Sequence, residues 1–350
     1  MSATNTADVS VPVTPNQSAS GPTQPEQKVL ARSLLSGKGY RLKLLNLYFR
    51  LFYDFLCSVD SMIGVTGIGF VSMLVVWNDM LHRKRDYPQF VRLRKVLGDN
   101  FWKGSIPFFH YYKMVRDWHE GAAIAVFYHR LGLPRWKKRF RVVGPLPQSH
   151  PEWGKRPVIF TFIHTGPFGL LCYWLRAQGI PVASLAGGLP LIVNNRHYLK
   201  IISIGNKRFG LENIPYVFQR HSALRESIRF LTPGHALLMA LDGGRPGEES
   251  ERCEAGGFPI LLRQGAVRLA AQTNAILIPI SVRRTSLCRF EIHFRAPVPD
   301  ELIDKHDPIK ANQHIISDLW PDIADHPTDL NWTPLEELAP SLKSDRISWP

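Results

Sequence analysis

Short apolar segments alternate with helical segments between residues 140 and 298, and this rhythm is the strongest constraint on the fold. The apolar segments are rich in Val, Ile, Leu and Phe and are bounded by Gly, Pro or charged residues, as buried strands are. Alternation of this kind predicts an α/β fold whose mostly parallel sheet is flanked by helices. The expected strands are Arg141–Val143, Val158–Ile163, Pro181–Ala186, Ile214–Phe218, Ala236–Leu241, Ile276–Val282 and Phe290–Phe294. The expected helices are Phe168–Gln178, Asn195–Ile204, Ser222–Leu231 and Leu261–Thr273.

The chain on either side of residues 140–298 differs in composition. Residues 1–28 are mostly Ser, Thr, Pro, Gln and Val, which predicts a disordered tail. Residues 29–139 are basic and aromatic and are expected to be helical, with a helix over Lys113–Leu131. Residues 299–350 carry 4 Lys and Arg against 11 Asp and Glu. In this acidic segment we expect a helix at Ile309–Leu319 and then an extended tail, packed on the domain or partly disordered.

Two stretches of residues 29–139 have the character of membrane-contacting segments. Val29–Phe55 alternates apolar residues with Lys and Arg, which is typical of a basic amphipathic helix. Ser61–Trp77 is a run of 17 residues without a charge, and a bilayer-spanning helix needs about 20. A short span, an interfacial anchor and a buried core helix all fit this second stretch. The same alternatives of surface helix and membrane contact stay open for the first.

The net charge of +14 restricts the kind of partner. Residues 33–156 carry 21 Lys and Arg against 8 Asp and Glu, so the first half can attract anionic lipid headgroups, an acidic carrier protein or nucleic acid. Nucleic-acid binding rests on charge alone, because no recognition motif accompanies it. The four cysteines are far apart and lack a Cys-x-x-Cys spacing, which predicts reduced thiols and no metal site.

A histidine stands at the end of the expected strand Val158–Ile163. His164 is followed by Gly166 and Pro167, which suit the cap and first residue of a helix. Catalytic groups of α/β proteins gather at the carboxyl ends of parallel strands, and imidazole titrates near neutral pH. His164 is therefore a candidate general base, although a purely structural histidine is the other interpretation.

A second turn of chemical interest follows the strand Ala236–Leu241. Its sequence is Asp242-Gly243-Gly244-Arg245. The glycines allow close approach of a ligand to the backbone, and a guanidinium can bind a phosphate with two parallel hydrogen bonds. The turn is a candidate anion site, but it lacks the Gly-Lys-Ser/Thr ending of a phosphate-binding P-loop.

The order of these features resembles the superfamily of glycerolipid, lysophospholipid and lipid A acyltransferases. After His164 and the Asp242–Arg245 turn come a Gly-Ala-x-x-Leu-Ala helix at Gly265–Ala270 and a strand carrying Ile278-Pro279. The resemblance covers about residues 140–298, and the amphipathic amino-terminal region is similar to the membrane-associated part of the lipid A type. It implies a glycerolipid acyltransferase-like fold, with acyl-CoA or acyl-carrier protein as co-substrate and no bound cofactor.

The resemblance also implies roles for individual residues. His164 would be the general base, supported by Asp242, and Gly243, Gly244 and Arg245 would position a phosphate-bearing acceptor or the acyl donor. Thr165 and Gly166, at the amino end of the next helix, would lie against the substrate and offer N–H donors to the oxyanion. Apart from the resemblance, the chemistry of arginine adds a wider set of candidates for lipid or carrier phosphates, of which we expect no more than one or two to bind and the rest to be ordinary surface charges: Arg208, Arg220, Arg225, Arg283 and Arg284.

One position departs from the family pattern. The family has an Asp or Glu five residues after the histidine, and this chain has Gly169 there. No acid occurs between His164 and Glu212, so a carboxylate must come from elsewhere. Glu212, Glu226 and Asp242 are the candidates, with Asp242 preferred because it also ends a strand. Otherwise the histidine acts alone, or catalysis has been lost.

The sequence thus predicts an acyltransferase on the cytoplasmic face of a bacterial inner membrane. It would move a fatty acyl group from a thioester to a hydroxyl or amine of a lipid or lipid-like acceptor. The alternative is a non-catalytic, lipid-binding membrane protein with the same fold, for which Gly169 is the reason.

Overall fold

The computed structural model of the protein describes residues 87–126, 134–186, 216–218, 223–243, 250–286 and 288–339. Several expected features lie outside these residues and stay predictions. They are the tail 1–28, the amphipathic stretch Val29–Phe55, the uncharged stretch Ser61–Trp77 and the helix Asn195–Ile204.

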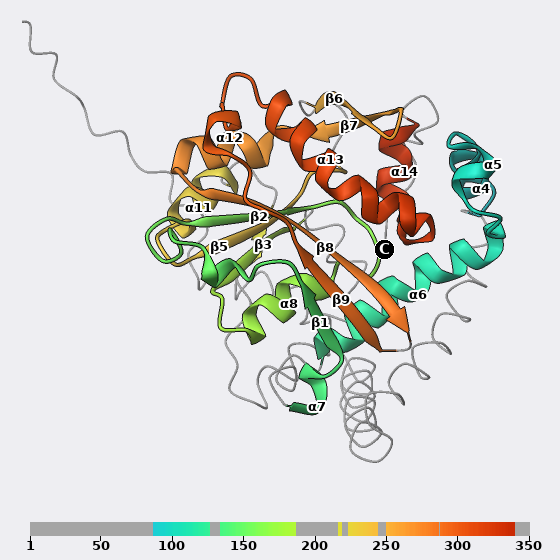
Figure 1. Cartoon of the computed structure of the whole chain (residues 1–350), viewed down its shortest axis with the longest axis horizontal. Helices are drawn as coiled ribbons and strands as arrows, with labels where there is room; N and C mark the ends of the chain where they lie inside the picture. Colours follow the sequence, from blue (N-terminus) through green and yellow to red (C-terminus); the bar gives the residue numbers. More distant parts are fainter. Residues whose placement is uncertain are drawn as a thin grey trace, which may run out of the picture. The chain divides into compact units, whose positions relative to one another are not determined.

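Seven strands of the described part of the chain form one mixed, mostly parallel sheet (Figure 1). All neighbouring pairs in the sheet are parallel except β8 and β9, which are antiparallel. The strands, in spatial order, are β1 (Phe140–Val143), β9 (Arg289–Phe294), β8 (Ile276–Ser286), β2 (Val158–Phe162), β5 (Ala236–Ala240), β3 (Val182–Ala186) and β4 (Tyr216–Phe218). The predicted α/β fold is therefore confirmed for the part that the structure describes.

Helices cover both faces of this sheet, which explains why β2 is buried at every position. Phe160 and Phe162 pack on the side of α8 (Leu170–Ala177), whereas Ile159 packs on the opposite side with α12 (Gly265–Thr273) and α13 (Ile309–Asp325). A strand buried on both faces loses the apolar–polar alternation of a half-exposed one. The remaining helices are α4 (Tyr87–Lys95), α5 (Gly98–Phe101), α6 (Pro107–Val126), α7 (Pro134–Lys137), α11 (Ala223–Phe230) and α14 (Trp332–Leu338), with short 3-10 turns η2 (Pro147–Ser149), η3 (Asp300–Leu302) and η4 (Pro327–Asp329).

Some expected boundaries were wrong. The predicted helix Leu261–Thr273 begins only at Gly265, because Leu261 and Leu262 belong to β7 (Phe258–Arg263). This strand pairs with β6 (Ser250–Ala255) in a hairpin that the sequence analysis missed. The helix predicted at Lys113–Leu131 begins earlier, at Pro107.

The carboxyl-terminal segment is also more regular than expected. The helix predicted at Ile309–Leu319 continues to Asp325, and α14 stands where an extended tail was predicted. One hydrophobic core joins apolar residues of α4 and α6 to α13 and α14, among them Phe90, Leu93, Met114, Ile315 and Leu335. The apolar core therefore crosses both expected domain boundaries, at residues 139/140 and 298/299. Within the described ranges, no helix is long and apolar enough to cross a bilayer.

Charged groups join α6 to β8 inside this core. Asp117 forms ion pairs with Arg284 and, at 3.6 Å, with Lys113, and both Asp117 and Arg284 are almost fully buried. Buried ion pairs stabilise little in net terms, but losing one partner leaves an uncompensated charge. The pair therefore holds α6 against the carboxyl-terminal end of β8.

We expect the stability of the protein to fall in mild acid because of His110. This side chain is buried against Phe90 and Trp102, and its Nε2 lies 3.0 Å from the carbonyl oxygen of Leu330. Burial lowers the pKa of His110 to about 3, against about 6.5 in the unfolded chain. Between these values the unfolded chain binds a proton that the folded chain does not, so stability decreases as pH falls, by at most about 1.4 kcal/mol per pH unit.

Urea unfolding of wild type and His110→Gln between pH 7.5 and 4.5 checks this expectation. The glutamine amide can still donate to Leu330 but does not titrate. The wild-type protein should lose stability faster than the variant below about pH 6.5. Parallel pH curves for the two proteins would contradict the assignment.

Candidate active site

His164 lies just past the carboxyl end of β2, in a tight turn. The N–H of Thr165 donates to the carbonyl oxygen of Ile163 at 2.6 Å, which turns the chain around His164. The imidazole packs edge-on against Phe168, with ring centroids 4.4 Å apart, and against Phe162. Its side chain is 23% exposed, so part of the imidazole lies at the protein surface.

Asp242 lies beside His164 because of the strand register. Phe162 of β2 is paired with Ala240 of β5 in parallel, and His164 and Asp242 each follow two residues later. Residues at equal offsets from a register pair of parallel strands emerge side by side. The Asp242 carboxylate is fully buried, and its Oδ1 lies 2.9 Å from His164 Nδ1.

The carboxylate determines the tautomer of the imidazole. Both carboxylate oxygens accept the backbone N–H of His164, each at 3.1 Å, and Oδ1 also faces Nδ1. An ionised carboxylate accepts hydrogen bonds only, so beside one a neutral imidazole carries its proton on Nδ1 and keeps the lone pair on Nε2. This is the arrangement of a histidine prepared to accept a proton at Nε2.

Glu226, the other candidate carboxylate that the structure describes, forms no ion pair with His164. Glu226 is exposed on α11, and Glu212 lies outside the described residues. Gly169, where the family pattern has its acid, is exposed at the N-cap of α8, and a Cβ at this position would meet no atom within 4 Å. Asp242, brought beside His164 by the strand register, is therefore the carboxylate that contacts the imidazole in the described part of the chain.

Three residues from the carboxyl-terminal segment hold the turn that contains His164. We call Asp329–Asn331 the strap. Gly166 donates its N–H to the Asp329 carbonyl at 2.7 Å, and Asn331 donates its N–H to the His164 carbonyl at 3.1 Å. Asn331 Nδ2 also donates to the Gly166 carbonyl at 3.1 Å, and Thr165 and Leu330 form an antiparallel bridge.

The strap changes the interpretation of the residues that follow His164. The N–H groups of His164, Thr165 and Gly166 donate to Asp242, Ile163 and Asp329 respectively. They are therefore not presented to an oxyanion in this structure. The expectation that Gly166 and Pro167 cap the next helix was wrong, because α8 begins at Leu170.

The remaining predicted binding residues divide into described and undescribed ones. Gly243 follows Asp242 with a φ of +74°, a conformation that favours glycine. Gly244, Arg245, Arg208 and Arg220 lie outside the described residues, and Arg225 is exposed on α11. Arg283 pairs with Glu291 at 2.6 Å and contacts His326, and Arg284 pairs with Asp117, so both already have protein partners.

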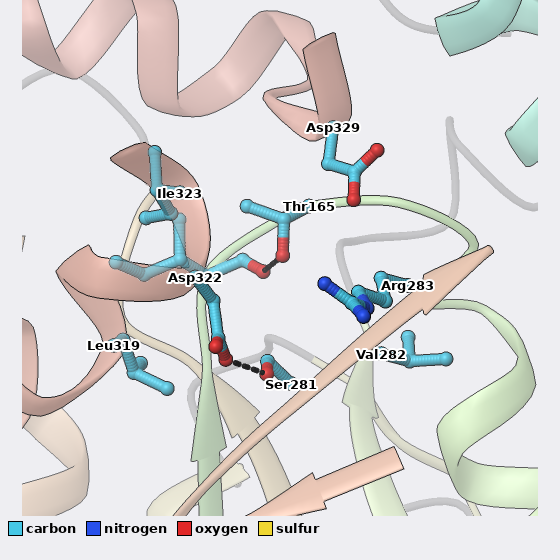
Figure 2. A pocket seen from close by; sticks show the side chains of 9 residues that line it. Thr165, Ser281, Val282, Arg283, Leu319, Asp322, Ile323 and Asp329 are labelled. Atoms are coloured by element: carbon cyan, nitrogen blue, oxygen red, sulfur yellow. Dashed lines mark hydrogen bonds between the residues drawn. The ribbon is translucent and has the colours of Figure 1, made fainter. Parts of the chain in front are cut away.

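A small pocket lies near this turn but does not include His164. Figure 2 shows Ser281 of β8 facing Asp322 of α13, and Ser281 Oγ donates to the Asp322 carboxylate at 2.8 Å. Ile163 and Thr165 line the pocket, whereas the imidazole between them in sequence packs against Phe162 and Phe168. In the part of the chain that the structure describes, no group of three or more His, Cys, Asp or Glu side chains could hold a metal ion.

The sequence matches no protein-family model, and no curated protein matches it. Among solved structures, the 1-acyl-sn-glycerophosphate acyltransferase PlsC from Thermotoga maritima is similar, with 13% sequence identity. The similarity covers 80% of this chain and 98% of that chain, with a TM-score of 0.35.

We expect Gly166→Ala to destabilise the protein. Gly166 has a φ of +52°, and a Cβ there would lie 2.5 Å from the carbonyl oxygen of Val282. The left-handed backbone alone costs an alanine roughly 1 kcal/mol, and the overlap with a backbone atom adds to it. Gly169→Ala is the matched control, because its Cβ would meet open space. Thermal unfolding should show a clear loss for the first variant and little change for the second. Equal midpoints for the two would contradict this account of Gly166.

Proposed function

We propose that the protein is a membrane-associated acyltransferase that moves a fatty acyl group from a thioester to a lipid or lipid-like acceptor. The donor is acyl-CoA or acyl-carrier protein, and the acceptor supplies a hydroxyl or an amine. The observation that carries the proposal is the 2.9 Å contact between His164 Nδ1 and the buried carboxylate of Asp242. The motif order along residues 140–298 supports the reaction class. The proposed location of the active site is the cytoplasmic face of a bacterial inner membrane.

In the proposed reaction the proton moves between defined atoms. His164 Nε2 removes the proton of the acceptor hydroxyl or amine while its oxygen or nitrogen attacks the thioester carbonyl. The tetrahedral intermediate then expels the thiolate, which takes the proton from the imidazolium, so that ester or amide and free thiol are the products. Asp242 holds the Nδ1–H tautomer and stabilises the imidazolium between the two steps.

Binding of the anionic substrate parts is assigned to the turn after Asp242. Gly243, Gly244 and Arg245 are the proposed ligands of a phosphate on the acceptor or the donor. Thr165 Oγ1 donates to Ile163 and the N–H of Gly166 binds the strap, so these two residues support the turn rather than hold substrate in this structure. No bound cofactor is part of the proposal.

Activity measurements separate this proposal from the non-catalytic alternative. Purified protein is incubated with acyl-CoA or acyl-carrier protein and a lipid extract, and free thiol and acylated lipid are measured. His164→Ala and Asp242→Asn should each lower kcat on the order of 10²-fold or more, because general-base catalysis is lost or its tautomer is no longer fixed. Glu226→Gln, which changes an exposed carboxylate, should keep wild-type turnover.

Two results would contradict the proposal. Unchanged turnover in His164→Ala would remove the histidine from the mechanism. Binding of lipid without turnover by the wild-type protein, for every thioester tried, would favour the non-catalytic lipid-binding alternative that Gly169 motivates.

An exposed apolar group at the start of α6 supports the membrane part of the proposal. Ile106 is 57% exposed and Phe109 is 61% exposed, and Phe108 beside them is 38% exposed. The neighbouring helix α4 carries Arg92 and Lys95, which are exposed as well. Aromatic side chains next to basic ones are typical of contact with an anionic bilayer surface.

We expect Phe109→Ser to weaken binding to vesicles of phosphatidylethanolamine and phosphatidylglycerol. Partial insertion of a phenyl ring is worth roughly 1 kcal/mol, so the apparent affinity should fall about five-fold in a co-sedimentation assay. Leu224→Ser, which changes an equally exposed apolar side chain on α11, is the control and should bind as wild type. Equal losses in both variants, or no loss in either, would contradict contact through this group.

A further inference from the structure

We propose that Asn331 is a positioning residue for His164, an inference that rests on the proposed function. Asn331 lies 167 positions after His164 in sequence and is 6% exposed. It makes two hydrogen bonds to the turn, from its backbone N–H to the His164 carbonyl and from Nδ2 to the Gly166 carbonyl, each 3.1 Å long. Asn331 therefore binds the carbonyl groups on both sides of Thr165.

The side chain of Asn331 does not cap the helix that begins after it. Asn331 is the N-cap of α14, where an asparagine normally accepts a backbone N–H of the helix's first turn. Here the N-cap makes no side-chain cap hydrogen bond, and the amide donates to Gly166 instead. A helix cap needs an acceptor oxygen, whereas the contact with Gly166 needs an N–H donor.

The position of the strap is itself fixed from α6. His110 Nε2 lies 3.0 Å from the Leu330 carbonyl oxygen, and it is the donor because a carbonyl oxygen can only accept. Lys113 Nζ forms an ion pair with the Asp329 carboxylate and donates to the Thr328 carbonyl at 3.3 Å. Because α6 holds the residues next to Asn331, the position of Asn331 does not depend on the turn alone, and Asn331 can hold the turn in place.

The backbone of His164 is consequently held on two sides. Its N–H is bound by Asp242 and its carbonyl by Asn331. Rotation of the peptide planes around His164 would break one of these bonds and move Nδ1 away from Oδ1. The consequence for chemistry is that Asn331 keeps His164 in the Nδ1–H tautomer without touching substrate.

The decisive variant is Asn331→Asp. Aspartate has the same shape and is as good an N-cap as asparagine, so a residue that only caps α14 would tolerate it. It lacks the Nδ2 donor and places a carboxylate oxygen against the Gly166 carbonyl. Asn331→Ser, another good cap with a shorter reach, is the second variant. Asn312→Asp is the matched control, because the buried Asn312 donates its Nδ2 to the Arg263 carbonyl at 3.2 Å and has no contact with the strap.

The test uses the full-length protein labelled with ¹⁵N-histidine, with the His164 signals assigned from His164→Gln. In the wild type the ¹⁵N shifts should report a protonated Nδ1 and a lone pair on Nε2. In Asn331→Asp and Asn331→Ser we expect a mixture of tautomers, together with a fall in kcat of ten-fold or more and a KM within two-fold of wild type. Asn312→Asp should leave the tautomer of His164 unchanged.

An unchanged Nδ1–H tautomer in a folded Asn331→Asp protein would overturn the inference, whatever the activity. The same tautomer change in Asn312→Asp would also overturn it, because the effect would then not be specific to the strap. The NMR measurement needs no substrate. Absence of turnover in the wild-type protein would therefore count against the proposed function and leave the positioning role to be decided by the tautomer.

Discussion

The buried carboxylate of Asp242 is the group on which the site depends. A charge without solvent is costly unless hydrogen bonds compensate for it, and here His164 supplies them from its backbone N–H and its Nδ1. These contacts exist because β2 and β5 are paired in a fixed register inside an apolar core. Strands buried on both faces resist a one-residue slip, since a slip would exchange the two sets of side chains. The apolar interior of the sheet therefore determines the geometry of its most polar pair.

A second constraint acts on the other side of His164. The strap Asp329–Asn331 binds the turn after β2, and His110 and Lys113 of α6 bind the strap. Segments from the basic first third, the middle and the acidic end of the chain meet at the carboxyl end of β2. The carboxyl-terminal segment is thus part of the site's support, and its charge complements the basic residues of α6.

Local sequence was sufficient where the physical cause is local. The apolar runs ending at Ile163 and Leu241 predicted strands whose ends carry His164 and Asp242, and the structure has β2 and β5 there. It failed where a distant partner decides: Leu261 and Leu262 fit a helix in isolation, but they pair with β6 instead. The predicted start of α8 was too early, because Gly166 is bound by the strap. No residue near Gly166 in the sequence indicates this contact.

The sequence by itself determined the alternating α/β architecture, the strand that presents His164 and the absence of an acid at residue 169, since composition and periodicity are properties of short segments. It also restricted the supporting carboxylate to a few candidates. Only the tertiary structure decided that Asp242 faces His164 Nδ1 and that Asn331 binds the turn. It also decided that the N–H of Gly166 donates to the Asp329 carbonyl. Each of these depends on strand register or on contacts between segments more than 70 residues apart, which a single sequence does not encode in any local pattern.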